Sequence, residues 1–137
     1  MPDTLVDAAS LAECLADPDW AVVDCRHRLT DPDFGEAAYL ESHVAGAVFA
    51  HADRVLSSDP VTDRGRHPLP DPSTLRARFG ALGIDSSTQV VAYDDAGGAI
   101  AGRLWWMLRY MGHTRAAVLD GGWPAWLAAG GATRGGE

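Results

Sequence analysis

The chain has 137 residues, of which 47% are hydrophobic and 22% charged, a composition typical of one compact globular domain rather than of a disordered segment. Its formal net charge of −8, with no run of basic residues, makes nucleic acid an unsuitable partner. The start, Met1-Pro2-Asp3-Thr4, lacks the pattern of a secretory signal, and no apolar run is long enough to cross a bilayer. We therefore expect a cytoplasmic protein with no membrane partner.

The two cysteines, Cys14 and Cys25, show neither a Cys-x-x-Cys motif nor the Cys/His spacing of a zinc site. One possible pair does not make a disulfide framework, so we expect two free thiols. The histidines share no common spacing that would suggest a metal site. We expect neither a metal nor a cofactor.

The first half of the chain alternates helical patterns with short apolar runs. Asp7 is suited to cap a helix over residues 8–15. Residues 20–24 are apolar without alternation, which predicts a strand buried on both faces. A short helix over 34–41 and a second buried strand over 46–50 follow.

Residues 57–72 are rich in proline and charge, which forbids a continuous helix or an interior strand and predicts an ordered surface excursion. Asp71 can then cap a helix that starts at Pro72, and Gly83 can end this helix in the left-handed conformation.

The second half continues the alternation. Its predicted elements are a strand over 89–93, a loop over 94–98, a helix to about Met111 ended by Gly112, a strand over 116–119 and a helix over 123–129. The whole pattern predicts an α/β fold with a mainly parallel sheet of about five strands. Residues 102–111 are apolar almost all round, so a second helix face could be an exposed aromatic patch, although a wide core contact would explain the same residues. The tail, residues 132–137, shows no anchor.

Three segments of the chain resemble the rhodanese family of sulfurtransferases. They are an Asp-x-Arg at a strand end with a following His-x-x-Gly-Ala turn (Asp24, Arg26, His43, Gly46), the segment Val90 to Arg103 in the place of the catalytic loop, and a Gly-Gly with a tryptophan after the last strand (Gly121, Gly122, Trp126). The resemblance implies a three-layer α/β/α rhodanese-like fold over residues 1–131. Residues 132–137 would then be a tail or the start of an interdomain linker.

Two further segments, residues 65–70 and 103–107, are similar to the amino-terminal half of tandem-domain thiosulfate and 3-mercaptopyruvate sulfurtransferases. In those proteins the first domain is non-catalytic. The resemblance therefore implies a partner, namely a carboxy-terminal catalytic rhodanese domain of the same polypeptide if one is present. It also implies that the parent protein is an enzyme while this chain alone is inactive.

A strand that turns abruptly into a helix points several backbone N–H groups into the turn, and such a loop binds anions. In active relatives the anion is a cysteine thiolate and then its persulfide. Here Asp94 takes that position, and a carboxylate cannot form a persulfide. Asp94 or Asp95 could equally be a turn or N-cap residue, and either interpretation predicts a catalytically silent loop. This vestigial loop consists of Asp94, Asp95, Ala96, Gly97, Gly98 and Ala99.

Arg103 lies where cell-cycle tyrosine phosphatases and arsenate reductases, which share the loop shape, place an oxyanion-binding arginine. Those enzymes also need the cysteine that is missing here. We therefore interpret Arg103 as a structural residue on the helix that could pair with Asp94 or Asp95.

Two alternatives to a silent domain remain open. Cys25, at the carboxyl end of a strand and next to Arg26, is a reserve nucleophile for weak sulfur transfer, or else a small core residue. A free-standing module could instead bind a small oxyanion. The candidates for binding sulfur-containing anions are Arg26, Arg66 with His67, and Arg103, which could otherwise be ordinary solvated charges.

Overall fold

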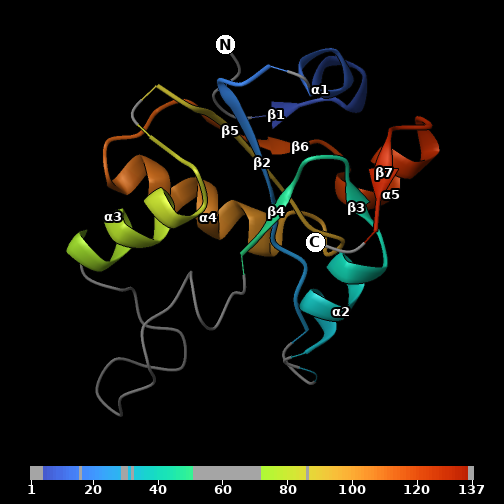
Figure 1. The fold of residues 1–137 in the computed structure, drawn as a ribbon, viewed down its shortest axis with the longest axis horizontal. Coiled ribbons are helices and arrows are strands. Elements are labelled where there is room, and N and C mark those ends of the chain that lie inside the picture. Colours follow the sequence, from blue (N-terminus) through green and yellow to red (C-terminus); the bar gives the residue numbers. More distant parts are fainter. Residues whose placement is uncertain are drawn as a thin grey trace.

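A computed structural model describes residues 5–135 except residues 16, 29–30, 32, 51–71 and 86, with the side chains of these ranges except those of residues 72–75. Its centre is a five-stranded sheet in which every neighbouring pair is parallel (Figure 1). In spatial order the strands are β1 (Leu5–Val6), β6 (Ala116–Leu119), β5 (Gln89–Tyr93), β2 (Trp20–Asp24) and β4 (Val48–Phe49). The predicted α/β class and mainly parallel sheet are confirmed.

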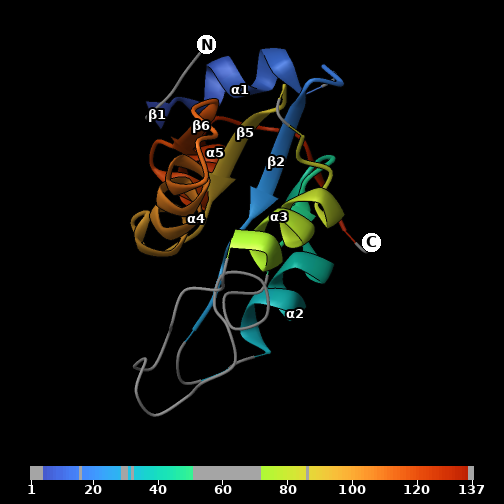
Figure 2. The same ribbon diagram turned by 90° about the vertical axis from the view of Figure 1, so that its left-hand side faces the viewer.

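Helices cover both faces of this sheet, as Figures 1 and 2 show from two directions. On one face lie α1 (Ala8–Cys14) and α5 (Gly122–Ala128), and on the other lie α3 (Pro72–Ala81) and α4 (Ala99–Tyr110). The remaining helix is α2 (Phe34–Glu41), which follows β2 in the chain. The fold therefore has three layers, with the sheet between two layers of helices.

Alternate side chains of the central strands enter two separate cores, because successive residues of a strand point to opposite faces. Val23 and Ala92 pack with Leu104 of α4 on one face. Val22 and Val91 pack with residues of α1 and α5 on the other face. Burial on both faces explains why these strands lack the alternation of polar and apolar residues that a half-exposed strand would show.

Most predicted boundaries are confirmed. The strands β2, β5 and β6 have the predicted ends. The Asp7 side chain caps α1 by accepting a hydrogen bond from the Ser10 N–H at 2.7 Å. Gly83 and Gly112 follow α3 and α4 in the left-handed conformation, each with φ of +84°. The predicted excursion over 57–72 and the Asp71 cap lie outside the described residues, apart from Pro72.

The strand predicted over residues 46–50 is shorter than expected and is not fully buried. Gly46 has φ of +83° and belongs to a turn closed by the hydrogen bond from the Ala47 N–H to the Val44 carbonyl, so only Val48 and Phe49 pair with β2. Both are half-buried because β4 is the edge strand of the sheet.

The prediction that residues 132–137 lack an anchor is wrong for residues 132–135. A second, antiparallel sheet pairs β3 (His43–Val44) with β7 (Thr133–Arg134). The Ala132 carbonyl also accepts hydrogen bonds from the Ala45 N–H and from the indole N–H of Trp126, both at 3.0 Å. The end of the described chain is thus tied to both the β3 strand and the buried helix α5.

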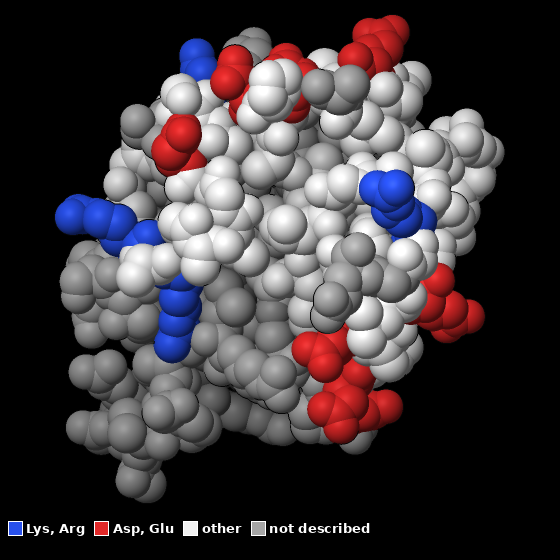
Figure 3. Space-filling model, in the orientation of Figure 1, with Lys and Arg blue, Asp and Glu red and all other residues white. Residues whose placement is uncertain are grey.

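The surface of the chain reflects its acidic composition. Figure 3 shows acidic side chains gathered over α2 at the lower right and along the upper edge of the molecule. The described residues Asp31, Asp33, Glu36 and Glu41, in or just before α2, are all exposed. Within the described ranges, no helix combines the length and apolar character needed to cross a bilayer.

Gly131 offers a test of the anchored tail, because a Cβ atom there would overlap the buried Trp126 indole. We expect Gly131→Ala to lower the free energy of unfolding by about 2 kcal/mol or more. A matched control is Gly80→Ala in α3, where a Cβ meets no atom within 4 Å and where alanine should stabilise the helix by roughly 0.5–1 kcal/mol. Urea unfolding measures both changes, and equal stability of the two variants would contradict the packing of the tail.

Candidate functional site

The candidate site is the loop that joins the end of β5 to the start of α4. Two glycines allow its tight course, because Gly97 and Gly98 have φ of +73° and +92°, a region that other residues rarely adopt. Gly98 is the N-cap residue of α4 and has no side chain with which to satisfy the free N–H groups of the first turn. Those groups need an acceptor from elsewhere in the chain.

The Asp94 carboxylate is that acceptor. Its Oδ1 atom accepts hydrogen bonds from the N–H groups of Ala96 and Gly98, both at 2.9 Å. Its Oδ2 atom accepts from the N–H groups of Ile100 and Ala101, both at 2.8 Å. With its side chain 1% exposed, Asp94 fills the loop and directs four amides onto one buried charge.

This geometry unites the two interpretations offered by the sequence. Ile100 and Ala101 belong to the first turn of α4, so Asp94 performs the task of an N-cap side chain although it lies five residues before the helix. It is also an anion held by a ring of amides at the positive end of the helix dipole. Both oxygens of the carboxylate are already occupied by the loop itself.

The Gly121–Gly122 turn after β6 packs directly against the backbone of the loop at Asp94. The Trp123 N–H donates a hydrogen bond to the Asp94 carbonyl at 2.9 Å. A Cβ atom on Gly122 would overlap that same carbonyl, and Gly122 itself has φ of +60°. Gly122 is therefore required by the close approach of this turn to the loop, a contact that the sequence did not indicate, whereas a Cβ atom on Gly121 would overlap Ala125 of α5.

Asp95 forms the outer part of the site with a partner that sequence reasoning missed. Arg28 donates to both Asp95 oxygens, with Nη1 at 2.7 Å and Nη2 at 3.1 Å, and its guanidinium lies 4.2 Å from the centre of the Phe34 ring. The sequence offers Arg103 as another residue that could pair with Asp94 or Asp95. In the structure Arg103 is half-buried on α4, and burial lowers its pKa. The Asp94 carboxylate is held by amides and Asp95 by Arg28.

A second polar cluster lies at the ends of β2 and β5. Arg26 donates to the Asp24 carboxylate through Nε and through Nη2 at 2.7 Å, and Nη2 also donates to the Ser42 carbonyl at 2.6 Å. The Tyr93 hydroxyl donates to Asp24 at 2.9 Å and accepts from the Val44 N–H at 3.1 Å. Burial and the neighbouring Asp24 carboxylate raise the pKa of Tyr93.

This cluster explains the Asp-x-Arg motif as a structural device. Asp24 is fully buried and Arg26 is 4% exposed, so the ion pair is shielded from water. The Arg26 guanidinium also lies 4.5 Å from the centre of the Trp123 ring. Arg26, one of the anion-binding candidates, is paired with Asp24 and also lines a pocket of about 300 Å³ together with Ser42 and Trp123. Arg66 and His67, the other loop candidates, lie outside the described residues.

Cys25 has the surroundings of a core residue. It is fully buried among Val23, Leu104 and Met107. Burial, together with the Asp24 and Asp94 carboxylates, raises the pKa of the Cys25 thiol. A protonated, inaccessible thiol is a poor nucleophile, so this environment opposes the reserve role considered above.

The other motif residues have structural partners. His43 Nδ1 lies 2.7 Å from the Tyr39 carbonyl, and its ring stacks on the Tyr39 ring with the centroids 3.8 Å apart. Gly46 forms the turn before β4, and Trp126 bonds the Ala132 carbonyl. In the part of the chain that the structure describes, no three His, Cys, Asp or Glu side chains gather in a way that could hold a metal ion.

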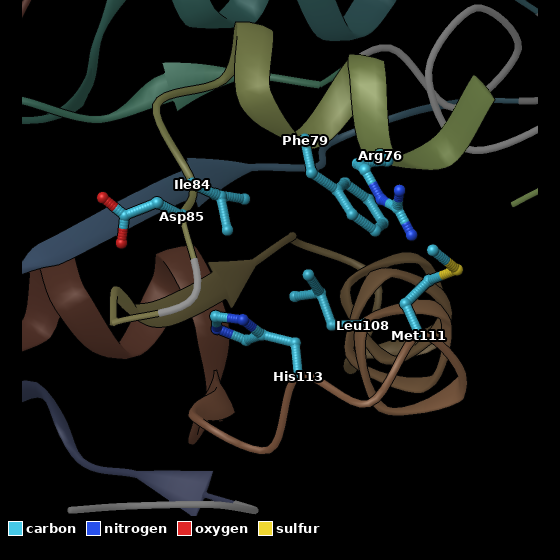
Figure 4. A pocket seen from close by; sticks show the side chains of 7 residues that line it. All are labelled: Arg76, Phe79, Ile84, Asp85, Leu108, Met111 and His113. Atoms are coloured by element: carbon cyan, nitrogen blue, oxygen red, sulfur yellow. The ribbon is translucent and has the colours of Figure 1, made fainter. Parts of the chain in front are cut away.

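A surface pocket of about 150 Å³ lies at the other end of α4, away from the Asp94 loop (Figure 4). Phe79, Ile84, Leu108 and Met111 form its apolar floor, with Arg76, Asp85 and His113 around it. His113 Nε2 lies 2.8 Å from the Thr88 carbonyl, just before β5 starts. The pocket thus borders the amino end of the sheet, while the loop lies at the carboxyl end.

Replacing the Asp94 carboxylate tests its role as the internal acceptor of the loop. We expect Asp94→Asn to lower the free energy of unfolding by about 2–4 kcal/mol, because an amide nitrogen would face two N–H donors that then lack a partner. Asp95→Asn is the matched control, since the Arg28 side chain is 40% exposed and such a pair contributes about 0–1 kcal/mol. Denaturant unfolding compares the two, and an Asp94→Asn variant as stable as the parent would contradict the assignment.

The accessibility of the two thiols tests the environment of Cys25. With its pKa raised, Cys25 should stay protonated and unreactive at about pH 8, whereas the partly exposed Cys14 should react. Titration with a chromogenic disulfide reagent should therefore detect one thiol in the native protein and both in denaturant. A Cys14→Ser variant should show none until it unfolds, and rapid labelling of Cys25 in that variant would contradict the buried position.

Comparisons with known proteins agree with this architecture. The family model of the rhodanese-like domain matches residues 7–129. A probable 3-mercaptopyruvate sulfurtransferase of Pseudomonas aeruginosa is 47% identical over 136 residues, which are 97% of this chain and 48% of that protein. A putative thiosulfate sulfurtransferase of Mycobacterium tuberculosis is 43% identical over 97% of this chain and 47% of its own length.

Solved structures show the same relationship. A 3-mercaptopyruvate sulfurtransferase from Leishmania major superimposes with a TM-score of 0.90 and 37% identity, covering 98% of this chain and 37% of that one. The present chain spans about half the length of the curated relatives it matches. It belongs to the rhodanese-like domain family, with homology to the amino-terminal domain region of 3-mercaptopyruvate and thiosulfate sulfurtransferases.

Proposed function

We propose that this chain is a catalytically silent rhodanese-like domain of a thiosulfate or 3-mercaptopyruvate sulfurtransferase, where it supports a catalytic rhodanese-like domain. The observation that carries the proposal is the Asp94 carboxylate, which accepts four amides inside the loop. Sulfur transfer in this family needs a thiolate that can bond a sulfane sulfur and release it again. A carboxylate oxygen keeps the negative charge of the thiolate but cannot carry the sulfur.

The named activities of the relatives support the substrate class of the parent protein. Relatives that match nearly all of this chain carry the names 3-mercaptopyruvate sulfurtransferase and thiosulfate sulfurtransferase, and about half of each lies outside the match. Small sulfur-containing anions are therefore the proposed substrates of the longer protein, and the catalytic cysteine would belong to the other half. The proposed role of this chain needs no cofactor.

Two free cysteines support a cytoplasmic location as part of the same proposal. Neither Cys14 nor Cys25 forms a disulfide. Free thiols are usual in the reducing cytoplasm, whereas secreted domains of this size often use disulfides.

A thiocyanate assay with thiosulfate and cyanide tests the silence of the chain. We expect no thiocyanate above the protein-free rate from the chain or from its Cys25→Ser variant, because Asp94 offers no sulfur acceptor and Cys25 is buried. The thiosulfate sulfurtransferase of Pseudomonas aeruginosa provides the positive control. Activity that disappears on Cys25→Ser substitution would replace the proposal with the weak-enzyme alternative.

The same samples address the oxyanion-binding alternative. Four N–H groups of the loop already donate to Asp94, so they are not available to an added anion. Thiosulfate or sulfate at about millimolar concentration should therefore leave the melting temperature of the chain unchanged. A rise in the melting temperature that saturates at about millimolar anion would favour an anion-binding module, whereas a rise without saturation at higher sulfate is the general effect of an excluded salt.

A further inference from the structure

The carboxyl-terminal ends of α3 and α4 meet at the pocket of Figure 4, and both ends have the same backbone geometry. A glycine with φ of +84° follows each helix. The next N–H group turns back onto the helix, so that Ile84 donates to the Phe79 carbonyl at 3.0 Å and His113 to the Leu108 carbonyl at 2.8 Å. This Schellman arrangement brings the side chain after the glycine against the last turn of the helix, and that side chain is usually apolar. Ile84 follows this rule, whereas the corresponding position after α4 holds His113.

Two polar groups of the pocket wall are engaged with the segment just before β5. The His113 ring is held in place because its Nε2 atom lies 2.8 Å from the Thr88 carbonyl, which can only accept a hydrogen bond. The Asp85 carboxylate accepts hydrogen bonds from the Ser87 N–H at 2.9 Å and from the hydroxyls of Ser87 and Thr88 at 2.8 and 3.0 Å. Figure 4 shows this carboxylate pointing away from the Arg76 guanidinium.

Arg76 is the charged group of the pocket that has no such partner. It lies three residues before Phe79 on α3, so the two side chains share one face of the helix, and Figure 4 shows them side by side. Among the residues that the structure describes, no carboxylate forms an ion pair with Arg76. Arg76 is exposed, and the pocket therefore presents one unpaired positive charge at the rim of an apolar floor.

The volume of the pocket limits what it can hold. About 150 Å³ is well below the roughly 300–1,000 Å³ of sites that bind cofactors and drug-sized molecules. An apolar cavity of this size accommodates a molecule about as large as benzene. Phe79, Ile84 and Leu108 are buried, so the floor is formed before any ligand arrives, and the flexible Met111 side chain can adapt to the ligand's shape.

We propose that the pocket between α3 and α4 binds a small monocarboxylate whose apolar body is about the size of a benzene ring. The apolar body packs on Phe79, Leu108 and Met111, and the carboxylate accepts hydrogen bonds from Arg76, whose planar guanidinium suits a carboxylate. An ammonium ligand of the same size would instead meet a like charge. The pocket borders the amino end of the sheet and the Asp94 loop lies at the carboxyl end, so this site is independent of the proposed function.

Methyl NMR can locate the ligand because the chain has two isoleucines, Ile84 and Ile100. Ile84 lines the pocket, whereas Ile100 lies in the first turn of α4 and donates to Asp94. With both δ1-methyl groups labelled with carbon-13, benzoate should shift the Ile84 signal with a dissociation constant of roughly 1–10 mM and leave the Ile100 signal in place. An Ile100→Val variant assigns the two signals.

Related probes separate the contributions of the ring and of the charge. Benzyl alcohol keeps the ring without the charge and should bind about three-fold more weakly than benzoate, and benzylamine, with the opposite charge, should bind more weakly still. Acetate and thiosulfate lack the apolar body, so neither should cause a saturable shift of the Ile84 signal.

An arginine substitution tests the charged contact. Arg76→Gln keeps most of the side-chain length without the charge and should raise the dissociation constant of benzoate about three-fold or more. Arg134→Gln is the matched control, because Arg134 is an exposed arginine on β7, outside the pocket, and this variant should bind benzoate like the parent. Both variants should melt within about 2 °C of the parent, since exposed side chains contribute little to folding.

The possible results bear on different parts of the proposal. No saturable shift of the Ile84 signal with benzoate would overturn it as a whole, and a shift of the Ile100 signal alone would overturn it by placing the anion at the Asp94 loop. Equal affinity for benzoate and benzylamine, or unchanged affinity on Arg76→Gln substitution, would overturn the assignment of a carboxylate ligand. The thiocyanate assay tests the proposed function separately, because it does not depend on whether this pocket is filled.

Discussion

The structure depends on a buried negative charge at the point where β5 becomes α4. A parallel strand that turns directly into a helix leaves N–H groups without partners, and their burial would cost free energy if nothing accepted their hydrogen bonds. Asp94 accepts four of them with one side chain. The loop can surround that carboxylate because Gly97 and Gly98 adopt the left-handed conformation. It also requires Gly122, where a Cβ atom would overlap the Asp94 carbonyl.

The end of the neighbouring strand β2 also buries a carboxylate, which is stabilised by an ion pair rather than by backbone amides. Asp24, at the end of β2, is fully buried; its charge is balanced by Arg26, and it also accepts a hydrogen bond from the Tyr93 hydroxyl at the end of β5. A buried ion pair costs desolvation and is favourable only when its remaining hydrogen bonds are made, as they are here through the Ser42 carbonyl and the Tyr93 hydroxyl. At the carboxyl edge of the sheet, where α/β proteins usually hold a ligand, the ends of β2 and β5 thus carry carboxylates that are satisfied within the protein.

The sequence was informative wherever local pattern decides the structure. The strands over 20–24, 89–93 and 116–119 are apolar because they are buried on both faces, and the caps at Asp7 and Gly83 follow from backbone chemistry. Asp94 could be placed in the loop because the residue directly after a buried strand has few other positions available. The sequence could predict that backbone N–H groups of the loop would donate to Asp94, but not that four of them would do so.

What the sequence did not reveal are contacts between segments far apart in the chain. The pairing of Arg28 with Asp95 spans 67 residues, and the β3–β7 pairing joins two strands of two residues each. Neither leaves a periodic signal, since two residues define no alternation and an arginine in a loop has many possible partners. The exposed aromatic pair on α4, Trp106 and Tyr110, was visible as a pattern, but only the structure could separate exposure from a wide core contact.

The Gly122 contact has a consequence for how the chain behaves as a unit. Because the turn before α5 rests directly on the Asp94 carbonyl, the loop cannot shift without displacing that helix, and α5 in turn holds the end of the described chain through Trp126. The loop, the turn before α5 and the end of the described chain are therefore joined by one continuous set of contacts, so a displacement of any one of them strains the other two.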